Sequence, residues 1–202
     1  MLRQCSGLDV LLERLGDCAA LTSLDMNFCQ GVIALPGRLG NCASLTSLKL
    51  SNCSRLATLP ARLGECAALT WLDLSGCTGL ATAALERLGD CAALNSLKMK
   101  NCVGRTALLE PLGDCAALTS LDLSDNYRLT WLPEQLGDCA ALTSLDLSQC
   151  HNLAKLPARL GDCAALKTPD LTYCSDVLRR HAVVVGLEAR GCAIGFKDGG
   201  DY

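Results

Sequence analysis

One phrase recurs along almost the whole chain and limits the fold more than any other feature of the sequence. Its clearest copy is LTSLDLSQCHNLAKLPARLGDCAA, residues 142–165. Successive copies begin 24 residues apart, with a single interval of 25. Their first residues are Leu21, Leu45, Leu69, Leu94, Leu118, Leu142 and Leu166. Repeats with a period of about 20 to 50 residues are typical of solenoids, in which each unit packs mainly against its two neighbours.

Within each copy, the apolar positions first alternate as in a β-strand and then give way to a turn. Counted from the first leucine, apolar residues recur at positions 1, 4, 6, 12, 15 and 19, and cysteine recurs at positions 9 and 22. Positions 4 and 6 have the period of a strand, with an outward-facing residue between them. Pro157 at position 16 and Gly161 at position 20 bracket a short helical turn, because proline suits the first helical position and glycine the exit. Each copy therefore predicts one strand and one tight outer turn.

The pattern LxxLxLxxCxxLxxLPxxLGxC resembles the leucine-rich-repeat family. The phrases LDLSQCHNLAKLP and LKLSNCSRLATLP are most similar to the repeats of plant-type intracellular immune receptors, although position 22 holds cysteine where those receptors usually have leucine. The resemblance covers residues 8–174. It implies an α/β leucine-rich-repeat solenoid, with a parallel β-sheet on the concave face and short helical or 3-10 turns on the convex face.

The two ends of the chain depart from the repeat. We expect about seven repeats within residues 1–174, and an irregular C-terminal cap with a loose tail in residues 175–202. Pro169 replaces the core leucine at position 4, which suits an edge strand. After it we expect a short helix from Asp176 and an extended segment over residues 183–196. The first repeat begins without a recognisable cap, so either the chain is a piece of something longer or its first edge allows edge-to-edge self-association.

Cysteine is the second regular feature, because fourteen of the fifteen cysteines fall into the two columns at positions 9 and 22. Position 9 holds Cys5, Cys29, Cys53, Cys77, Cys102, Cys150 and Cys174, and position 22 holds Cys18, Cys42, Cys66, Cys91, Cys115, Cys139 and Cys163. The family resemblance implies that position 9 forms a ladder that satisfies backbone groups, with Asn126 doing through its amide what cysteine does elsewhere. Position 22 is interpreted as a packing site.

Periodic placement favours reduced, structural thiols, and together with the absence of a signal-like apolar segment near Met1 it predicts a cytoplasmic protein. Disulfides along a column remain an alternative, because neighbouring strands about 4.8 Å apart lie within the permitted Cα separation. A metal site is not expected, since the cysteines lack CxxC-like spacing and His151 and His181 match no ligand pattern.

Several functional classes are not expected from this sequence. We find no nucleophile, nucleotide-binding or phosphate-binding motif, so we expect no enzyme activity and no cofactor. The formal net charge of −3 argues against general nucleic-acid binding. No apolar run approaches the roughly 18 residues of a spanning helix, so we expect no membrane insertion.

The outward positions 3, 5 and 7 of each strand supply the candidate binding residues. Position 5 reads Asp25, Lys49, Asp73, Lys98, Asp122, Asp146 and Asp170. Charges of opposite sign can pair across adjacent strands, whereas the acidic run at the end is unfavourable. Nothing in the repeat requires this run, so it is either tolerated or kept for a basic partner or a cation. The candidate contact residues are Trp71, Asp73, Lys98, Lys100, Asp122, Asp146 and Asp170.

Tryptophan occurs twice, and the two positions predict different roles. Trp71 interrupts a column of Ser and Thr at position 3. It is either a binding hot spot, for which tryptophan is enriched, or a local variation that covers a neighbour. Trp131 at position 14 is expected to pack in the turn.

The leading functional hypothesis is a protein-interaction scaffold that binds a protein or peptide, partly basic, on its concave face. The alternative is the ligand-sensing segment of a larger receptor or enzyme, such as an immune receptor, a kinase or a GTPase.

Overall fold

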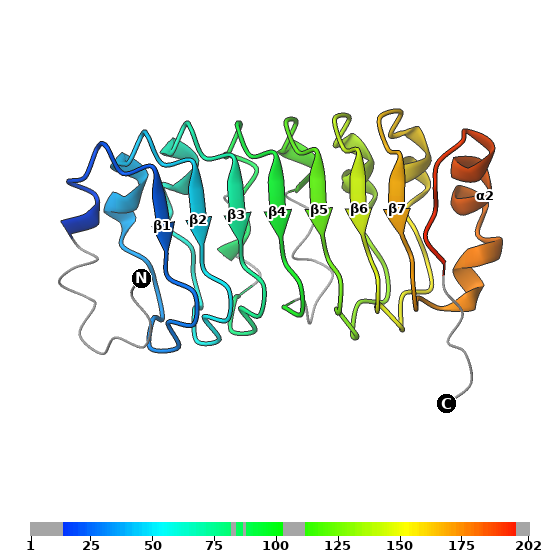
Figure 1. The fold of residues 1–202 in the computed structure, drawn as a ribbon, viewed down its shortest axis with the longest axis horizontal. Helices are drawn as coiled ribbons and strands as arrows, with labels where there is room; N and C mark the ends of the chain where they lie inside the picture. Colours follow the sequence, from blue (N-terminus) through cyan, green and yellow to red (C-terminus); the bar gives the residue numbers. More distant parts are fainter. Residues whose placement is uncertain (1–13, 82–83, 87, 103–111, 197–202) are drawn as a thin grey trace.

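The chain forms one open, seven-stranded parallel sheet in which the strands follow the order of the sequence (Figure 1). The computed structural model describes residues 14–81, 84–86, 88–102 and 112–196. Each strand is three residues long and occupies positions 3 to 5 of its repeat. The strands are β1 (Ser23–Asp25), β2 (Ser47–Lys49), β3 (Trp71–Asp73), β4 (Ser96–Lys98), β5 (Ser120–Asp122), β6 (Ser144–Asp146) and β7 (Thr168–Asp170). The predicted α/β repeat solenoid is confirmed.

The register of the sheet follows the repeat residue by residue. Leu24 pairs with Leu48 and Leu48 with Leu72, so the position-4 leucines stack on each other in the core. The backbone ladder continues past each strand, since Met26 N donates to Lys49 O at 2.8 Å and Phe28 N to Ser51 O at 2.7 Å. The leucines of the repeat form one continuous buried core, as the repeat pattern predicts.

Directly after each strand, position 8 turns through the left-handed region of backbone conformation. Its φ is between 49° and 71° in all seven repeats, and the residues are Phe28, Asn52, Gly76, Asn101, Asp125, Gln149 and Tyr173. This region is disfavoured for most side chains and is tolerated best by Gly, Asn and Asp. Four of the seven positions hold one of these types. Position 8 is therefore where the chain leaves the sheet, a feature that the repeat pattern alone did not show us.

Short 3-10 helices on the other side of the core return the chain to the next strand. They are η1 (Gly37–Asn41), η2 (Leu63–Glu65), η5 (Glu134–Asp138) and η6 (Ala158–Asp162). The expected bracketing is wrong in detail. Pro157 precedes η6 as its N-cap with extended backbone, and Gly161 lies inside the helix rather than at its exit.

The glycine at position 20 serves the stacking of repeats instead. A Cβ on Gly137 would overlap the Cβ and the carbonyl oxygen of Arg159 in the following repeat, and a Cβ on Gly40 would overlap Arg62 in the same way. Beside Gly161 the next outer turn is replaced by helix α2 (Ala182–Ala189), which packs against η6, and nothing lies within 4 Å of the equivalent point. The glycine column therefore lets each outer turn approach the backbone of the next.

Both cysteine columns form hydrogen-bonded ladders. At position 9, the thiols of Cys53, Cys77, Cys150 and Cys174 donate to a carbonyl in the preceding repeat over 3.0 to 3.3 Å. At position 22, those of Cys42, Cys66, Cys115 and Cys139 do the same over 3.0 to 3.3 Å. The sequence predicts only packing at position 22. Apart from the exposed Cys18, the thiols of this column are buried, and those named above also satisfy a carbonyl of the previous outer turn.

The C-terminal segment covers the last repeat with a helix. After η7 (Asp176–Arg180), helix α2 (Ala182–Ala189) buries Val183, Val184 and Leu187 at the end of the core (Figure 1). The expected extended segment over residues 183–196 is therefore wrong in its first half. Its second half is extended and continues the sheet, since Ala193 N donates to Lys167 O at 2.9 Å. Pro169 accordingly lies in β7, which is followed in the sheet only by this short segment.

The expectations for the uncapped first repeat concern residues that lie mostly outside the described ranges, which begin at Arg14. None of the helices within those ranges combines the length and the apolarity that a segment crossing a bilayer needs.

Candidate functional site

The sheet face, meaning the outward side chains at positions 3, 5 and 7 of the seven strands, holds all the candidate contact residues. In β3, Trp71 is half-buried, and Lys49 Nζ of the neighbouring strand lies 5.6 Å from the centre of its ring. Trp71 therefore remains accessible while its ring also pairs with a cation, an interaction worth about 0.5 to 1 kcal/mol at exposed sites.

The charged column at position 5 is in register across the sheet. Asp73 is opposite Lys98, and Asp122 is opposite Asp146, which in turn is opposite Asp170. The predicted neighbours are therefore adjacent. Within the described ranges, none of the oppositely charged pairs of this column approaches to ion-pair distance. The three aspartates of β5, β6 and β7 therefore lie side by side, and no lysine of the same column neutralises them.

The aspartates of position 5 have a local role that our sequence reasoning missed. Asp146 Oδ1 accepts the backbone N–H of Ser148 at 2.9 Å, and Asp170 Oδ1 accepts that of Thr172 at 2.8 Å. Asp122 accepts both the backbone N–H and the hydroxyl of Ser124. The repeat therefore does make use of these acids, contrary to our expectation. The recurring D-x-S phrase is the signal that could have shown it.

The two candidate lysines differ in their surroundings. Lys98 in β4 is exposed. Lys100 Nζ lies 2.6 Å from Asp125 Oδ2, and this hydrogen-bonded partner raises the pKa of Lys100. Lys100 is thus already paired within the chain, whereas Lys98 makes no ion pair with the residues that the structure describes.

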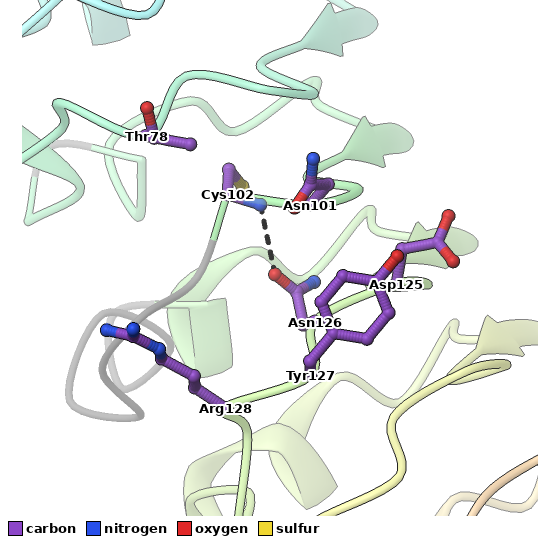
Figure 2. A pocket seen from close by; sticks show the side chains of 7 residues that line it. All are labelled: Thr78, Asn101, Cys102, Asp125, Asn126, Tyr127 and Arg128. Atoms are coloured by element: carbon purple, nitrogen blue, oxygen red, sulfur yellow. Dashed lines mark hydrogen bonds between the residues drawn. The ribbon is translucent and has the colours of Figure 1, made fainter.

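A pocket of about 250 Å³ lies among the turns that follow β3, β4 and β5 (Figure 2). Its lining includes Asn126, the exception in the position-9 column. Asn126 Oδ1 accepts the backbone N–H of Cys102 at 3.0 Å, and its Nδ2 donates to the carbonyls of Met99 and Leu123 at 3.0 and 2.6 Å. With a longer contact to Ser124 O at 3.4 Å, Asn126 bonds four backbone groups across two repeats, which supports the expected ladder role.

The buried thiols are poorly suited to nucleophilic chemistry. Burial raises the pKa of Cys77 and of Cys139 to about 12, and that of Cys53 to about 11. The thiolate is the reactive form of cysteine, so these side chains remain unreactive near neutral pH. In the described ranges, no group of three or more His, Cys, Asp or Glu residues could hold a metal ion.

The two histidines have structural contacts. His151 Nδ1 lies 2.7 Å from the carbonyl oxygen of Tyr173, so this nitrogen carries the hydrogen. His181 Nδ1 accepts the backbone N–H of Val183 at 3.4 Å and caps α2. Trp131, expected to pack, is instead 41% exposed, although the next residue, Leu132, is buried in the core. That expectation is wrong.

Comparisons with known proteins agree with this architecture. A family model described as leucine-rich repeat matches residues 117–139. No curated protein matches the chain at a significant level.

Among solved structures, the leucine-rich repeat domain of the type III effector XopL superimposes with a TM-score of 0.69 at 22% identity, over 91% of this chain and 63% of that one. A leucine-rich-repeat protein of Leptospira interrogans gives 0.65 at 22% identity, over 88% of this chain and 43% of that one. Internalin C2 of Listeria monocytogenes gives 0.54 at 15% identity, over 90% and 83%. The chain thus spans less than two thirds of the first two. The seven parallel strands in register, the matching family model and these three superpositions together identify the fold as a leucine-rich-repeat solenoid.

Proposed function

We propose that this chain is a protein-interaction scaffold that binds a protein or peptide on its sheet face, the face expected to be concave. The observation that carries the proposal is the regular array of partly exposed side chains at positions 3 and 5 of strands held in one register. A rigid array of this kind can contact an extended partner without loss of conformational freedom in the scaffold.

Two features of the sheet face set the character of the partner. Trp71 offers apolar area at β3, and Asp122, Asp146 and Asp170 form a negative stripe over β5, β6 and β7. One oxygen of each carboxylate accepts a backbone N–H, and this hydrogen bond fixes the orientation of the charged group. We therefore propose a partner that is basic in part, held by an association that weakens as salt rises above about 0.15 M.

The test first isolates a partner by affinity capture with the unaltered chain and then measures its binding to variants. Trp71→Ala, and the combined change of Asp122, Asp146 and Asp170 to Asn, should each weaken binding. Asparagine still accepts the backbone N–H through its own oxygen, so the combined variant removes charge without removing the local hydrogen bond. Arg14→Ala and Arg62→Ala on the outer side are the controls. Loss of binding only in the controls would place the site on the outer side instead.

The compartment is part of the same proposal. A thiol that donates a hydrogen bond cannot also be in a disulfide, and both cysteine columns donate along the solenoid. These contacts support reduced thiols, and we propose that the protein works in a reducing compartment, the cytoplasm. Thiol titration after denaturation of protein prepared under native conditions should find nearly all fifteen cysteines reduced. Several disulfides within a column would contradict this placement.

A second candidate function follows from the comparisons. The match to the repeat domain of a type III effector shows the same fold as one part of a larger protein. This chain could then be the ligand-sensing segment of a receptor, a kinase or a GTPase, with no catalytic residues of its own. A transcript that joins these repeats to a nucleotide-binding or kinase segment would decide in favour of this second function.

A further inference from the structure

Exposed rings gather in the turns that follow the three acidic strands. Tyr127, after β5, is 49% exposed, and Tyr173, after β7, is 37% exposed. Between them in the sequence, His151 after β6 stacks on Tyr127, with ring centres 5.9 Å apart and planes 15° from parallel. We name Tyr127, His151 and Tyr173 the aromatic ledge.

The ledge is held in place by contacts of its own. The hydrogen bond between His151 Nδ1 and Tyr173 O joins the turn after β6 to the turn after β7. Asn152 Nδ2 donates to Tyr127 O at 2.5 Å and joins the turn after β6 to the turn after β5. The turns that carry the rings are thus joined to one another, and Tyr127 and Tyr173 remain open to solvent.

The ledge and the acidic stripe belong to the same three repeats. Asp122, Asp146 and Asp170 come five, five and three residues before Tyr127, His151 and Tyr173. Each of these carboxylates uses Oδ1 for a backbone N–H, which leaves Oδ2 as the oxygen available to a partner. Each acidic strand of β5–β7 is therefore followed within five residues by a turn that carries an exposed ring.

Arginine is the side chain that matches both features. Its planar guanidinium offers N–H groups to carboxylate oxygens and also stacks on aromatic faces, whereas the lysine ammonium is a strongly hydrated point charge. We propose that the strands β5–β7 and the aromatic ledge form a docking surface for an arginine-bearing segment of a partner protein. This inference rests on the proposed function and adds the chemistry of the partner and the part of the face that it contacts.

Two synthetic peptides of equal length and charge test the proposal, one alternating glycine with arginine and the other alternating glycine with lysine. Binding of each to the full chain is measured by calorimetry at low ionic strength. The arginine peptide should bind about two- to five-fold more tightly, because only the planar guanidinium can stack on a ring and donate in a bidentate fashion to a carboxylate. Equal affinities for the two peptides, or no binding of either, would overturn the arginine surface.

Variants separate the ledge from the stripe. The double variant Tyr127→Leu/His151→Leu should remove the preference for arginine, because it weakens the binding of the arginine peptide more than that of the lysine peptide. Asp146→Asn should weaken the binding of both peptides, because it removes a negative charge. The matched control is Phe28→Leu, because Phe28 is also an exposed ring in a turn (44%) but lies after β1. An arginine preference that survives the double variant would overturn the role of the ledge.

The same variants keep this inference distinct from the proposed function. If Trp71→Ala and the Asp→Asn variants lose the captured partner while the ledge variant retains it, the sheet face is the binding site and the arginine surface is wrong. If the captured partner is indifferent to every sheet-face variant, the proposed function fails, whatever the peptides show.

Discussion

Single residues control how each strand ends, and position 8 carries the strongest conformational demand. The chain passes through the left-handed region there in all seven repeats. A side chain that cannot bond locally to its own backbone is strained by about 1–2 kcal/mol in this region. Asn52, Asn101 and Asp125 suit the conformation, whereas Phe28 and Gln149 do not. The solenoid therefore stores avoidable strain at particular repeats.

Relieving this strain should stabilise the protein. Gln149→Asn is expected to raise the free energy of unfolding by up to about 1 kcal/mol, because asparagine tolerates a positive φ. Gly76→Ala in the same column should have the opposite effect. Gly76 has a φ of 71°, and a Cβ there would lie 2.5 Å from Asn52 Oδ1. Urea denaturation measures both changes, and a stabilising Gly76→Ala would contradict this account of position 8.

The position-9 ladder gives a second prediction at the residue scale. Cys77 is fully buried and its thiol donates to Leu50 O at 3.1 Å. Cys77→Asn should be mild, because Asn126 already performs this role in another repeat. Cys77→Leu should cost about 1–3 kcal/mol through overpacking and the loss of the donor. If urea denaturation finds the two variants equally destabilised, the thiol only fills volume in the core and its hydrogen bond is not needed.

At the scale of the element, the outer turns are joined to one another more than the sequence suggests. Arg159 pairs with Asp138 of the preceding repeat, with Nη1 2.9 Å from Oδ2, although Asp162 is three residues away in its own turn. Arg62 does pair within its own turn, with Glu65. The carboxylate of Glu134 accepts the backbone N–H groups of Ala158 and Arg159. Contacts between neighbouring 3-10 helices thus supplement the sheet.

Two glycines in identical sequence contexts test the close approach of these turns. Gly137→Ala should lower the free energy of unfolding by about 1–3 kcal/mol, because the new Cβ meets the backbone of Arg159. Gly161→Ala should be neutral or slightly stabilising, since nothing lies within 4 Å and alanine restricts the unfolded chain. Both glycines occur in the phrase LGDCAA, so local propensity predicts equal effects of the two substitutions on stability. Equal thermal midpoints of the two variants would therefore contradict the stacking role.

At the scale of the whole molecule, the buried thiols link stability to alkaline pH. Burial raises the pKa of Cys77, Cys115 and Cys139 to about 12 from the ordinary value of 9.0. The stabilising effect of a raised pKa is fully present below the unfolded value and is lost as the pH rises towards the folded value. Between about pH 9 and pH 12 the unfolded chain releases protons that the folded chain retains.

We therefore expect the free energy of unfolding contributed by these thiols to be constant near neutral pH and to fall steadily above about pH 9. Urea denaturation across this range measures the slope. Replacing Cys77 and Cys139 together with asparagine should make the slope shallower, because two of the titrating groups are gone. A slope that does not change in this variant would assign the alkaline loss to other groups.

The C-terminal end shows where local pattern and tertiary packing diverge. Three consecutive valines favour an extended chain by propensity, yet they begin α2. The helix forms because Val183, Val184 and Leu187 cover the open end of the core. Gly191, with a φ of 84°, ends it, and Arg190 donates to Gly161 O and Cys163 O of the repeat that begins at Leu142. Burial at the end of the solenoid outweighs a weak local preference.

The sequence by itself determined the repeat, a strand around positions 4 and 6, and the leucine core. These follow from alternation over a few residues, repeated often enough to leave one register, whereas the ladder role of Asn126 was implied by the resemblance to leucine-rich repeats. Only the tertiary structure decided which groups meet between repeats. The carbonyl partners of the position-22 thiols, the contact beside Gly137 and the stacking of Tyr127 on His151 each join residues 22 to 27 positions apart. Such contacts depend on the exact offset between neighbouring repeats, which the packing of the core sets and no local pattern encodes.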